Sequence, residues 1–213
     1  MDSQKIRAST NERLRAAGAP ECSTSLPVLL PQGERPVSPV LKRALVLGLV
    51  AMAAGGLDAD SVQQELKRFS LEDELTALEA ACINAHEGLD LSVEADLSWE
   101  AEACRALAWA LGLAPALPVR DDGGEWEGEF VELLKAGSAG VLEKRAAPRS
   151  AEQLVLEADF YRCYRSIYRE LTPPDAAVGM EPQVGPLPAQ TVLKRAKALV
   201  WLLVPTTPWD SLG

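Results

Sequence analysis

The segment with the most evident capacity for chemistry is DDGGEWEGEFVELL, which places carboxylates around two aromatic side chains. Calcium is the first ligand to test, because it prefers clustered carboxylates. A calcium-binding loop beginning at Asp121 would have Glu132 at the required twelfth position. Its third and sixth positions would be Gly123 and Trp126, where a ligand and a glycine are needed. The segment therefore predicts no metal site.

The same segment is typical of a surface that binds a basic protein. An aromatic side chain supplies buried contact area, and surrounding carboxylates speed the encounter with a partner of opposite charge. The predicted partner-binding residues are Asp121, Asp122, Glu125, Trp126, Glu127 and Glu129. The alternative is that Trp126 and Phe130, four residues apart, face the core, and that the carboxylates only form a solvated face.

Catalytic constellations are few. The chain has one histidine, His86, so a site that needs several histidine ligands is excluded. Cys82 lies four residues before His86, a helical spacing that would suit a nucleophile and its base. A small core cysteine near a polar helix end explains both residues more simply. No glycine-rich phosphate loop occurs, and no cofactor is expected.

Arginines supply the other candidate chemistry. Arg162, Arg165 and Arg169 share one face of a predicted helix and could hold a phosphate or an acidic partner. The helix macrodipole is a simpler reason for them, because acidic residues precede them in the same helix. An enzyme of unknown reaction, using carboxylates and arginines of the helices 99–112 and 149–169, is the alternative function.

Charge narrows the class of partner. The 213 residues include 21 Lys and Arg against 31 Asp and Glu, a formal net charge of −10. Residues 58–134 hold the whole excess, with 19 acidic and 4 basic side chains. Nucleic acid is not an expected partner, because its binding depends on neutralising phosphates with Lys and Arg. A basic protein is the expected partner.

Three features bear on location. The N-terminal MDSQKIRASTNERLRAAG is polar and lacks the apolar region of a secretory signal. The longest uncharged apolar stretch, residues 44–57, would extend about 21 Å as a helix, less than the roughly 30 Å of a bilayer core, so no membrane span is expected. The cysteines show no close pairing, as in reduced cytosolic proteins. The expected location is cytoplasmic.

Apolar periodicity and capping residues predict an all-α fold, a single compact domain over residues 1–213 with about eight helices. Ser38 before Pro39, and Ser150 with Gln153, are helix-start signals. The predicted helices are residues 3–17, 38–55, 60–69, 71–85, 99–111, 125–136, 151–171 and 189–204. Connections rich in glycine and proline leave room for short β segments.

The pentapeptide VLKRA occurs at residues 40–44 and again at 192–196, within the apolar helices 38–55 and 189–204. Those two helices and the helix 98–111 are expected at the centre of the fold, because they are the most apolar. The flanking sequences differ, which argues against duplication. In each copy the Lys-Arg pair lies in the first two turns, where its charge can reach solvent while leucines face inward.

Several blocks together resemble one protein family. The blocks are Arg7-x-x-x-Asn11-x-x-Leu14-x-x-x-Gly18, Leu26-Pro27, Arg35-Pro36, Arg43-Ala44, WEAEACRALAWALGL, RSAEQLVLEADFYR, Lys194-Arg195, Ala198-Leu199-x-Trp201-Leu202 and Trp209-Asp210. In this order, and over nearly the whole chain, they resemble the bacterial family called domain of unknown function 4272. The resemblance implies a single, mostly helical domain in the bacterial cytoplasm, and it brings no agreed activity and no catalytic residues. Where the family pattern has Glu-Arg, this chain has Lys194-Arg195.

Small size, focused acidity and the lack of a catalytic signature favour a protein-binding module over an enzyme. In its most concrete form, the expected function is that of an immunity or antitoxin-like protein, which neutralises a basic toxin in the cytoplasm through the acidic surface.

Overall fold

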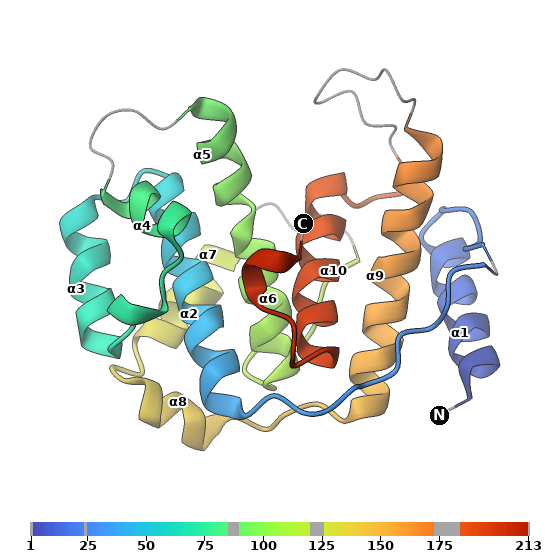
Figure 1. The fold of residues 1–213 in the computed structure, drawn as a ribbon, viewed down its shortest axis with the longest axis horizontal. Helices are drawn as coiled ribbons and strands as arrows, with labels where there is room; N and C mark the ends of the chain where they lie inside the picture. Colours follow the sequence, from blue (N-terminus) through green and yellow to red (C-terminus); the bar gives the residue numbers. More distant parts are fainter. Residues whose placement is uncertain (1, 24, 85–89, 120–125, 173–183, 213) are drawn as a thin grey trace. The chain divides into compact units, whose positions relative to one another are not determined.

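The computed structural model describes residues 2–23, 25–84, 90–119, 126–172 and 184–212 (Figure 1). Within these ranges the chain forms helices and connections without a strand, so the predicted all-α fold is confirmed. Contacts divide the chain into unit 1 (Met1–Glu34, Pro118–Gly123 and Arg149–Gly213) and unit 2 (Arg35–Leu117 and Gly124–Pro148). One domain over residues 1–213, with the helices 38–55 and 189–204 together at its centre, stays a prediction.

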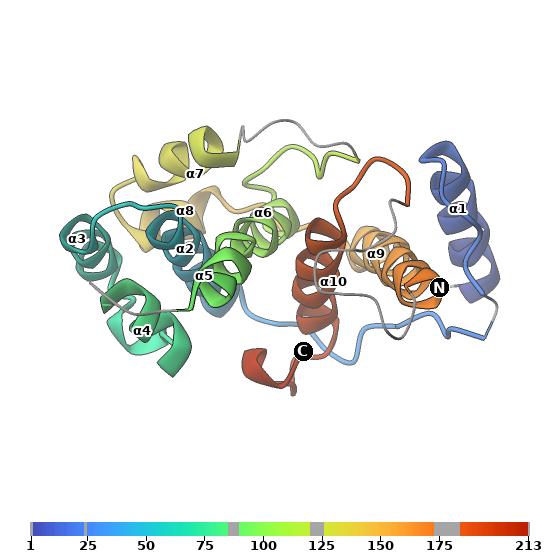
Figure 2. The ribbon, with the colours of Figure 1, turned by 90° about the horizontal axis from the view of Figure 1, so that it is seen from above.

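Unit 1 is built around a long helix that carries buried aromatic side chains. Its helices are α1 (Ser3–Ala16), α9 (Ala151–Leu171), α10 (Ala189–Leu203) and the short 3₁₀-helix η2 (Trp209–Ser211). Figure 2 shows α9 between α1 and α10, and it packs on both. Phe160, Tyr161 and Tyr164 of α9 are fully buried. The hydroxyl of Tyr164 donates to the carbonyl of Val184 at 2.5 Å, which attaches the segment before α10 to α9.

Unit 2 is built around α2. Its helices are α2 (Val37–Ala54), α3 (Ala59–Phe69), α4 (Ala77–Asn84), α5 (Leu91–Ser98), α6 (Glu100–Ala110), α7 (Trp126–Leu134) and α8 (Ala139–Arg145), with the 3₁₀-helix η1 (Glu72–Glu74). α2 contacts α3, α4, α5, α6 and α8. Residues 43–51 of α2 are buried without interruption, because neighbouring helices surround it. A helix that is apolar all round requires such an environment.

By length and composition, α2 is also the one helix of the described residues that could cross a membrane. Of that stretch, 61% is buried within the protein. The core helix of a soluble protein passes the same test, so α2 is weak evidence for a membrane span.

The capping box predicted at the start of α9 is confirmed. The backbone N–H of Gln153 donates to the Ser150 hydroxyl at 3.3 Å, and the backbone N–H of Ser150 donates to the Gln153 side chain at 3.0 Å. Two donors that the first turn leaves without partners are thereby satisfied. α2 begins one residue earlier than predicted, at Val37, with Pro36 as its N-cap.

The helix start predicted at Ser70 is wrong. Ser70 has φ +55°, a left-handed conformation that ends α3. α4 begins only at Ala77, because Thr76 and Glu79 form the capping box: the Thr76 N–H donates to the Glu79 carboxylate at 2.9 Å, and the Glu79 N–H donates to the Thr76 hydroxyl at 3.3 Å. The sequence offered two overlapping start signals, and the second one operates.

The two VLKRA copies place their arginines differently from the prediction. Arg43 and Arg195 are both buried instead of reaching solvent. Arg43 pairs with the buried carboxylate of Glu79. Arg195 donates to the carbonyl of Pro118 at 2.6 Å and to the hydroxyl of Tyr161 at 2.7 Å. Each copy belongs to a different unit, and each arginine binds acceptors that lie far away in the sequence.

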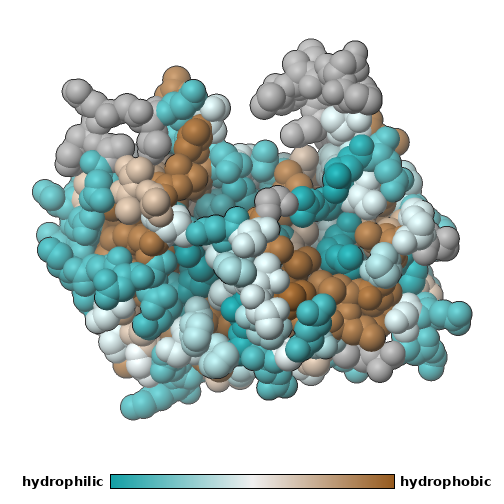
Figure 3. Space-filling model, viewed as in Figure 1, coloured by the Kyte–Doolittle hydropathy of each residue, from teal (hydrophilic) through white to brown (hydrophobic). Residues whose placement is uncertain are grey.

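Some apolar side chains remain at the surface of unit 2. Figure 3 shows apolar surface over α5, where Leu91 is 80% exposed. Leu78 of α4 is also exposed. Single exposed leucines are ordinary in folded proteins, so they define no site by themselves.

Candidate functional site

The first turn of α7 holds the described part of the predicted partner-binding segment. Trp126, Glu127 and Glu129 lie in this turn. Asp121, Asp122 and Glu125 lie outside the described residues. The site is therefore defined by α7 and by the residues packed against it.

The two aromatic residues of α7 differ in burial. Phe130 is 2% exposed, and its ring fills the space beside Gly48 of α2, where an added Cβ atom would lie 2.2 Å from the ring. Trp126 is half-buried, with its ring centroid 5.8 Å from that of Phe130. Phe130 therefore belongs to the core, which agrees with the alternative that both aromatic residues face the core. Trp126 differs, because part of it remains accessible.

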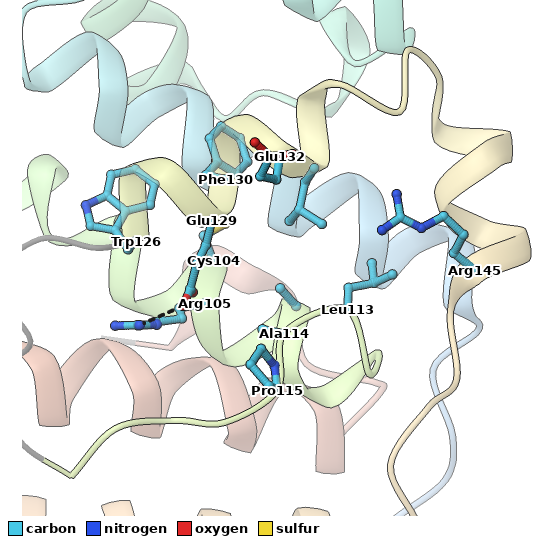
Figure 4. A pocket seen from close by; sticks show the side chains of 12 residues that line it. Cys104, Arg105, Leu113, Ala114, Pro115, Trp126, Glu129, Phe130, Glu132 and Arg145 are labelled. Carbon is cyan, nitrogen blue, oxygen red and sulfur yellow. Dashed lines mark hydrogen bonds and ion pairs between the residues drawn. The ribbon is translucent and has the colours of Figure 1, made fainter.

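That accessible ring lines a pocket of about 210 Å³ in unit 2. Figure 4 shows Trp126 and Phe130 of α7 above Ala114 and Pro115 of the segment after α6, with Arg145 of α8 on the opposite side of the view from Trp126. The rest of the lining is Cys104, Arg105, Ala108, Leu113, Glu129, Glu132 and Leu133. Most of these side chains are apolar, so the pocket suits an apolar or aromatic group with a few polar contacts at its edge.

The charged residues of the pocket are mostly paired. Arg105 of α6 is buried and donates from Nη2 to Oε1 of Glu129 at 3.1 Å. The Arg105 side chain is 4% exposed and that of Glu129 is 38% exposed, so the pair reaches from the interior to the surface. Glu132 accepts from Lys135 at 2.5 Å on the exposed side of α7. Arg105, Glu129 and Glu132 therefore offer a ligand in this pocket no uncompensated charge.

The pocket cysteine is a poor nucleophile. Burial raises the pKa of the Cys104 thiol to about 12, so it stays protonated near neutral pH. Burial also raises the pKa of Cys82, the candidate nucleophile of the sequence. His86, its proposed base, lies outside the described residues. Among the described residues, no group of three or more His, Cys, Asp or Glu side chains could hold a metal ion.

The enzyme alternative would be favoured by a pocket lined by Glu102, Glu152 and Arg162. Glu102 belongs to unit 2, whereas Glu152 and Arg162 belong to unit 1. Arg162 donates to the carbonyl of Pro27 at 2.9 Å, and burial lowers its pKa. In the part of the chain that the structure describes, the pocket at Trp126 is lined by none of these three residues.

Arg105 is the site residue that sequence reasoning missed. It occupies an inward position of an alanine-rich helix, between Ala101 and Ala108, which are also buried. A lone arginine on a buried helical face is a signal for a carboxylate partner, because an unpaired buried charge is costly. The partner itself had no local signal, since Glu129 lies 24 residues away.

Unit 1 contains an arginine–carboxylate pair that is enclosed by the protein. Asp159 accepts from Nε and Nη2 of Arg7 at 3.1 and 3.0 Å, and from the hydroxyl of Thr10 at 2.8 Å. Arg7 also donates to the carbonyls of Ser23 and Leu26. These residues hold the N-terminal segment against α9, which is a structural role.

Of the comparisons with known proteins, the one with family models gave a match. No curated protein and no solved structure matches the chain. The model of one protein family matches residues 6–212, a range that includes both the closed pair of unit 1 and the pocket of unit 2. The chain therefore belongs to the family described as a domain of unknown function (DUF4272).

Proposed function

We propose that the protein is a protein-binding module, and that a basic partner docks on α7 with one apolar side chain in the pocket beside Trp126. The observation that carries this proposal is the half-buried tryptophan in an apolar pocket, on a helix that also presents carboxylates to solvent. Partly exposed aromatic anchors of this kind contribute much of the binding energy in protein interfaces.

The pocket and its surroundings have separate roles in this proposal. The pocket takes an apolar or aromatic side chain, because Leu113, Pro115 and Leu133 line it and Glu129 is already paired. Glu127 and Glu132 are exposed and lie on the same helix, where they attract basic residues of the partner. Attraction of this kind raises the association rate more than it lengthens the life of the complex.

In its most concrete form, the proposal is that the partner is a basic toxin and that this immunity or antitoxin-like protein neutralises it in the cytoplasm. The net charge of −10, concentrated in residues 58–134, supports a basic partner. Among the described residues, no group of three or more His, Cys, Asp or Glu side chains could hold a metal ion, and burial raises the pKa of the pocket thiol of Cys104, which supports binding over catalysis.

The test is capture of partners from the native host with matched variants. Trp126→Ala should lose the partner, whereas the double variant Glu72→Lys, Asp73→Lys should retain it. This control reverses two exposed carboxylates of η1 in the same unit. Its charge change equals that of a second test variant on α7, Glu127→Lys, Glu132→Lys.

The captured partner is then purified and its binding kinetics are measured at low and at physiological salt. Trp126→Ala should weaken binding about thirtyfold, equivalent to ~2 kcal/mol, mainly through faster dissociation. Glu127→Lys, Glu132→Lys should slow association at low salt and less so at physiological salt, because salt screens exposed charge. A partner that binds Trp126→Ala as tightly as the wild type, when this variant unfolds at the normal temperature, would overturn the proposal.

A further inference from the structure

The lining of the pocket beside Trp126 includes one cation that is not paired within the protein. The charged residues that line it, among those described, are Arg105, Glu129, Glu132 and Arg145. Arg105 pairs with Glu129. Glu132 pairs with a lysine of its own helix. Within the described part of the chain, the Arg145 side chain takes part in no ion pair or hydrogen bond. Its guanidinium is therefore the charge that a ligand in this pocket can neutralise.

Arg145 and Trp126 lie at opposite sides of the pocket. Figure 4 shows the Arg145 guanidinium extending from α8 toward the pocket, on the side away from Trp126. Most of the remaining lining is apolar and includes Leu113, Phe130 and Leu133. A group that fills this pocket therefore meets an aromatic ring at one end, apolar side chains along its length and a guanidinium at the other end.

The helix dipole explains the charge of Arg145 only in part. Arg145 is the last residue of α8, and cations in the last turn stabilise a helix. Lys144 meets the same need in the same turn, and it does not line the pocket. The dipole therefore gives no reason for a second cation beside the apolar lining. An anionic ligand gives such a reason, because arginine binds carboxylates in a defined geometry.

The size of the pocket limits what can reach both ends. Its volume of about 210 Å³ is below the roughly 300–1,000 Å³ of pockets that hold drug-sized ligands, so it suits a group no larger than a residue. An internal residue of a protein with an apolar side chain carries no carboxylate, because its carboxyl group is in a peptide bond. Only the last residue of a chain combines an apolar side chain with a carboxylate.

We propose that the partner inserts its C-terminal residue into this pocket, with an apolar side chain against Trp126 and the terminal carboxylate on Arg145. This inference rests on the proposed function, since it specifies which part of the partner enters the pocket. The guanidinium offers a planar fork of donors that matches the two oxygens of a carboxylate. Basic residues that precede the chain end are attracted by the exposed carboxylates of Glu127 and Glu132.

Two synthetic peptides test the inference on the full chain. Both have the sequence acetyl-Lys-Lys-Gly-Gly-Leu, and one ends in a free carboxylate whereas the other ends in an amide. Titration followed by NMR measures the two affinities. The acid should bind about tenfold more tightly, because the amide offers no charge to Arg145. Arg145→Gln should remove this preference by weakening the acid alone. Trp126→Ala should weaken both peptides and leave the preference in place.

The apolar end and the source of the carboxylate have separate probes. A peptide acid that ends in glycine instead of leucine should bind about tenfold more weakly, because it places no side chain in the pocket. N-Acetylleucine, which is the chain end alone, should also bind more weakly than the peptide acid at low salt, because it lacks the lysines. Equal affinities for N-acetylleucine and the peptide acid would overturn the chain end in favour of a small free carboxylate.

The matched control is Lys144→Gln, which removes the neighbouring exposed cation of α8 and should leave both affinities unchanged. Arg145 is exposed as well, so its variant should fold normally. An acid preference that survives Arg145→Gln would overturn the inference. Equal affinities of acid and amide for the wild type, or no binding of the acid up to about 10 mM, would overturn it too.

The captured partner separates failure of this inference from failure of the proposed function. The partner should bind Arg145→Gln about tenfold more weakly, and removal of its own last residue should weaken binding to the wild type. A partner that is lost by Trp126→Ala but is indifferent to both of these changes would overturn the chain end and leave the proposed function standing. A partner that is indifferent to Trp126→Ala would overturn the proposed function itself.

Discussion

Two arginine–carboxylate pairs of this protein, Arg7–Asp159 in unit 1 and Arg105–Glu129 in unit 2, are built differently. In unit 1, the side chain of Arg7 is 13% exposed and that of Asp159 is fully buried. In unit 2, the Arg105 side chain is 4% exposed, but that of its partner Glu129 is 38% exposed. The first pair is enclosed, whereas the second lies in the wall of a pocket.

The difference in exposure separates a pair that no ligand can reach from a pair that a ligand can reach. The Asp159 side chain accepts hydrogen bonds from Arg7 and Thr10 and has no exposed surface, so it fastens the N-terminal segment to α9 and is inaccessible to a ligand. Glu129 accepts a hydrogen bond from Arg105, and with Trp126 it lines the pocket. The same two chemical groups thus form an enclosed pair at Arg7–Asp159 and part of a pocket wall at Arg105–Glu129.

Asp159→Ala should have the largest effect, because it leaves the largely buried guanidinium of Arg7 without its carboxylate. Breaking such a pair typically costs about 3–5 kcal/mol. Urea unfolding measures the loss. Glu129→Ala is the matched comparison and should cost less, because the pocket lets water reach the Arg105 guanidinium once the partly solvated carboxylate is removed. Equal losses would show that the two pairs do not differ in the way their exposure indicates.

Raising the pH into the alkaline range should have the second-largest effect, a loss of stability in the buried interior of unit 1. All three tyrosines lie on α9, and burial raises the pKa of Tyr161 from 10.0 to about 12. The folded pKa exceeds the unfolded one, so the stabilisation is complete below pH 10 and is lost as the pH rises toward 12. This difference corresponds to ~3 kcal/mol. Phenolate absorbance should rise together with unfolding, whereas early ionisation of all three tyrosines in the folded protein would contradict the burial.

Gly48→Ala should perturb the floor of the open pocket by a smaller amount. An added methyl group would meet the Phe130 ring at 2.2 Å, and overpacking of a core costs about 1–3 kcal/mol. Gly128→Ala is the matched control on α7, where an added methyl group meets nothing within 4 Å. It should stabilise the protein by about 0.5–1 kcal/mol, because alanine favours a helix. Thermal unfolding of the two variants should therefore shift in opposite directions.

Glu129→Gln should have the smallest effect on folding. The amide can still accept a hydrogen bond from Arg105, and the lost charge is partly solvated, so we expect a change within about 0.5 kcal/mol. Chemical denaturation with added salt provides the measurement. A loss above about 2 kcal/mol would mean that the Arg105–Glu129 pair is a structural element like that of unit 1.

Local signals in the sequence were sufficient for most of the described helices of this protein. Capping residues and apolar positions at helical spacing predicted α9 with its capping box and the extent of α10. These features act within a few residues. They failed where two start signals overlapped, at Ser70 and Thr76, since the left-handed Ser70 depends on how α3 ends. The helices α5 and α8 are short and only weakly patterned, and they were not predicted.

By itself, the sequence determined the fold class, the apolar helices, the acidic middle of the chain and the family. Only the tertiary structure decided which charges meet. Arg7 and Asp159 are 152 residues apart, and Arg105 and Glu129 are 24 apart, so no periodicity connects them. Packing alone also decided that Phe130 enters the core while Trp126 stays at its edge. The reason is physical: a helix is stabilised by neighbours three or four residues away, whereas burial of a charge or a ring depends on elements that only folding brings together.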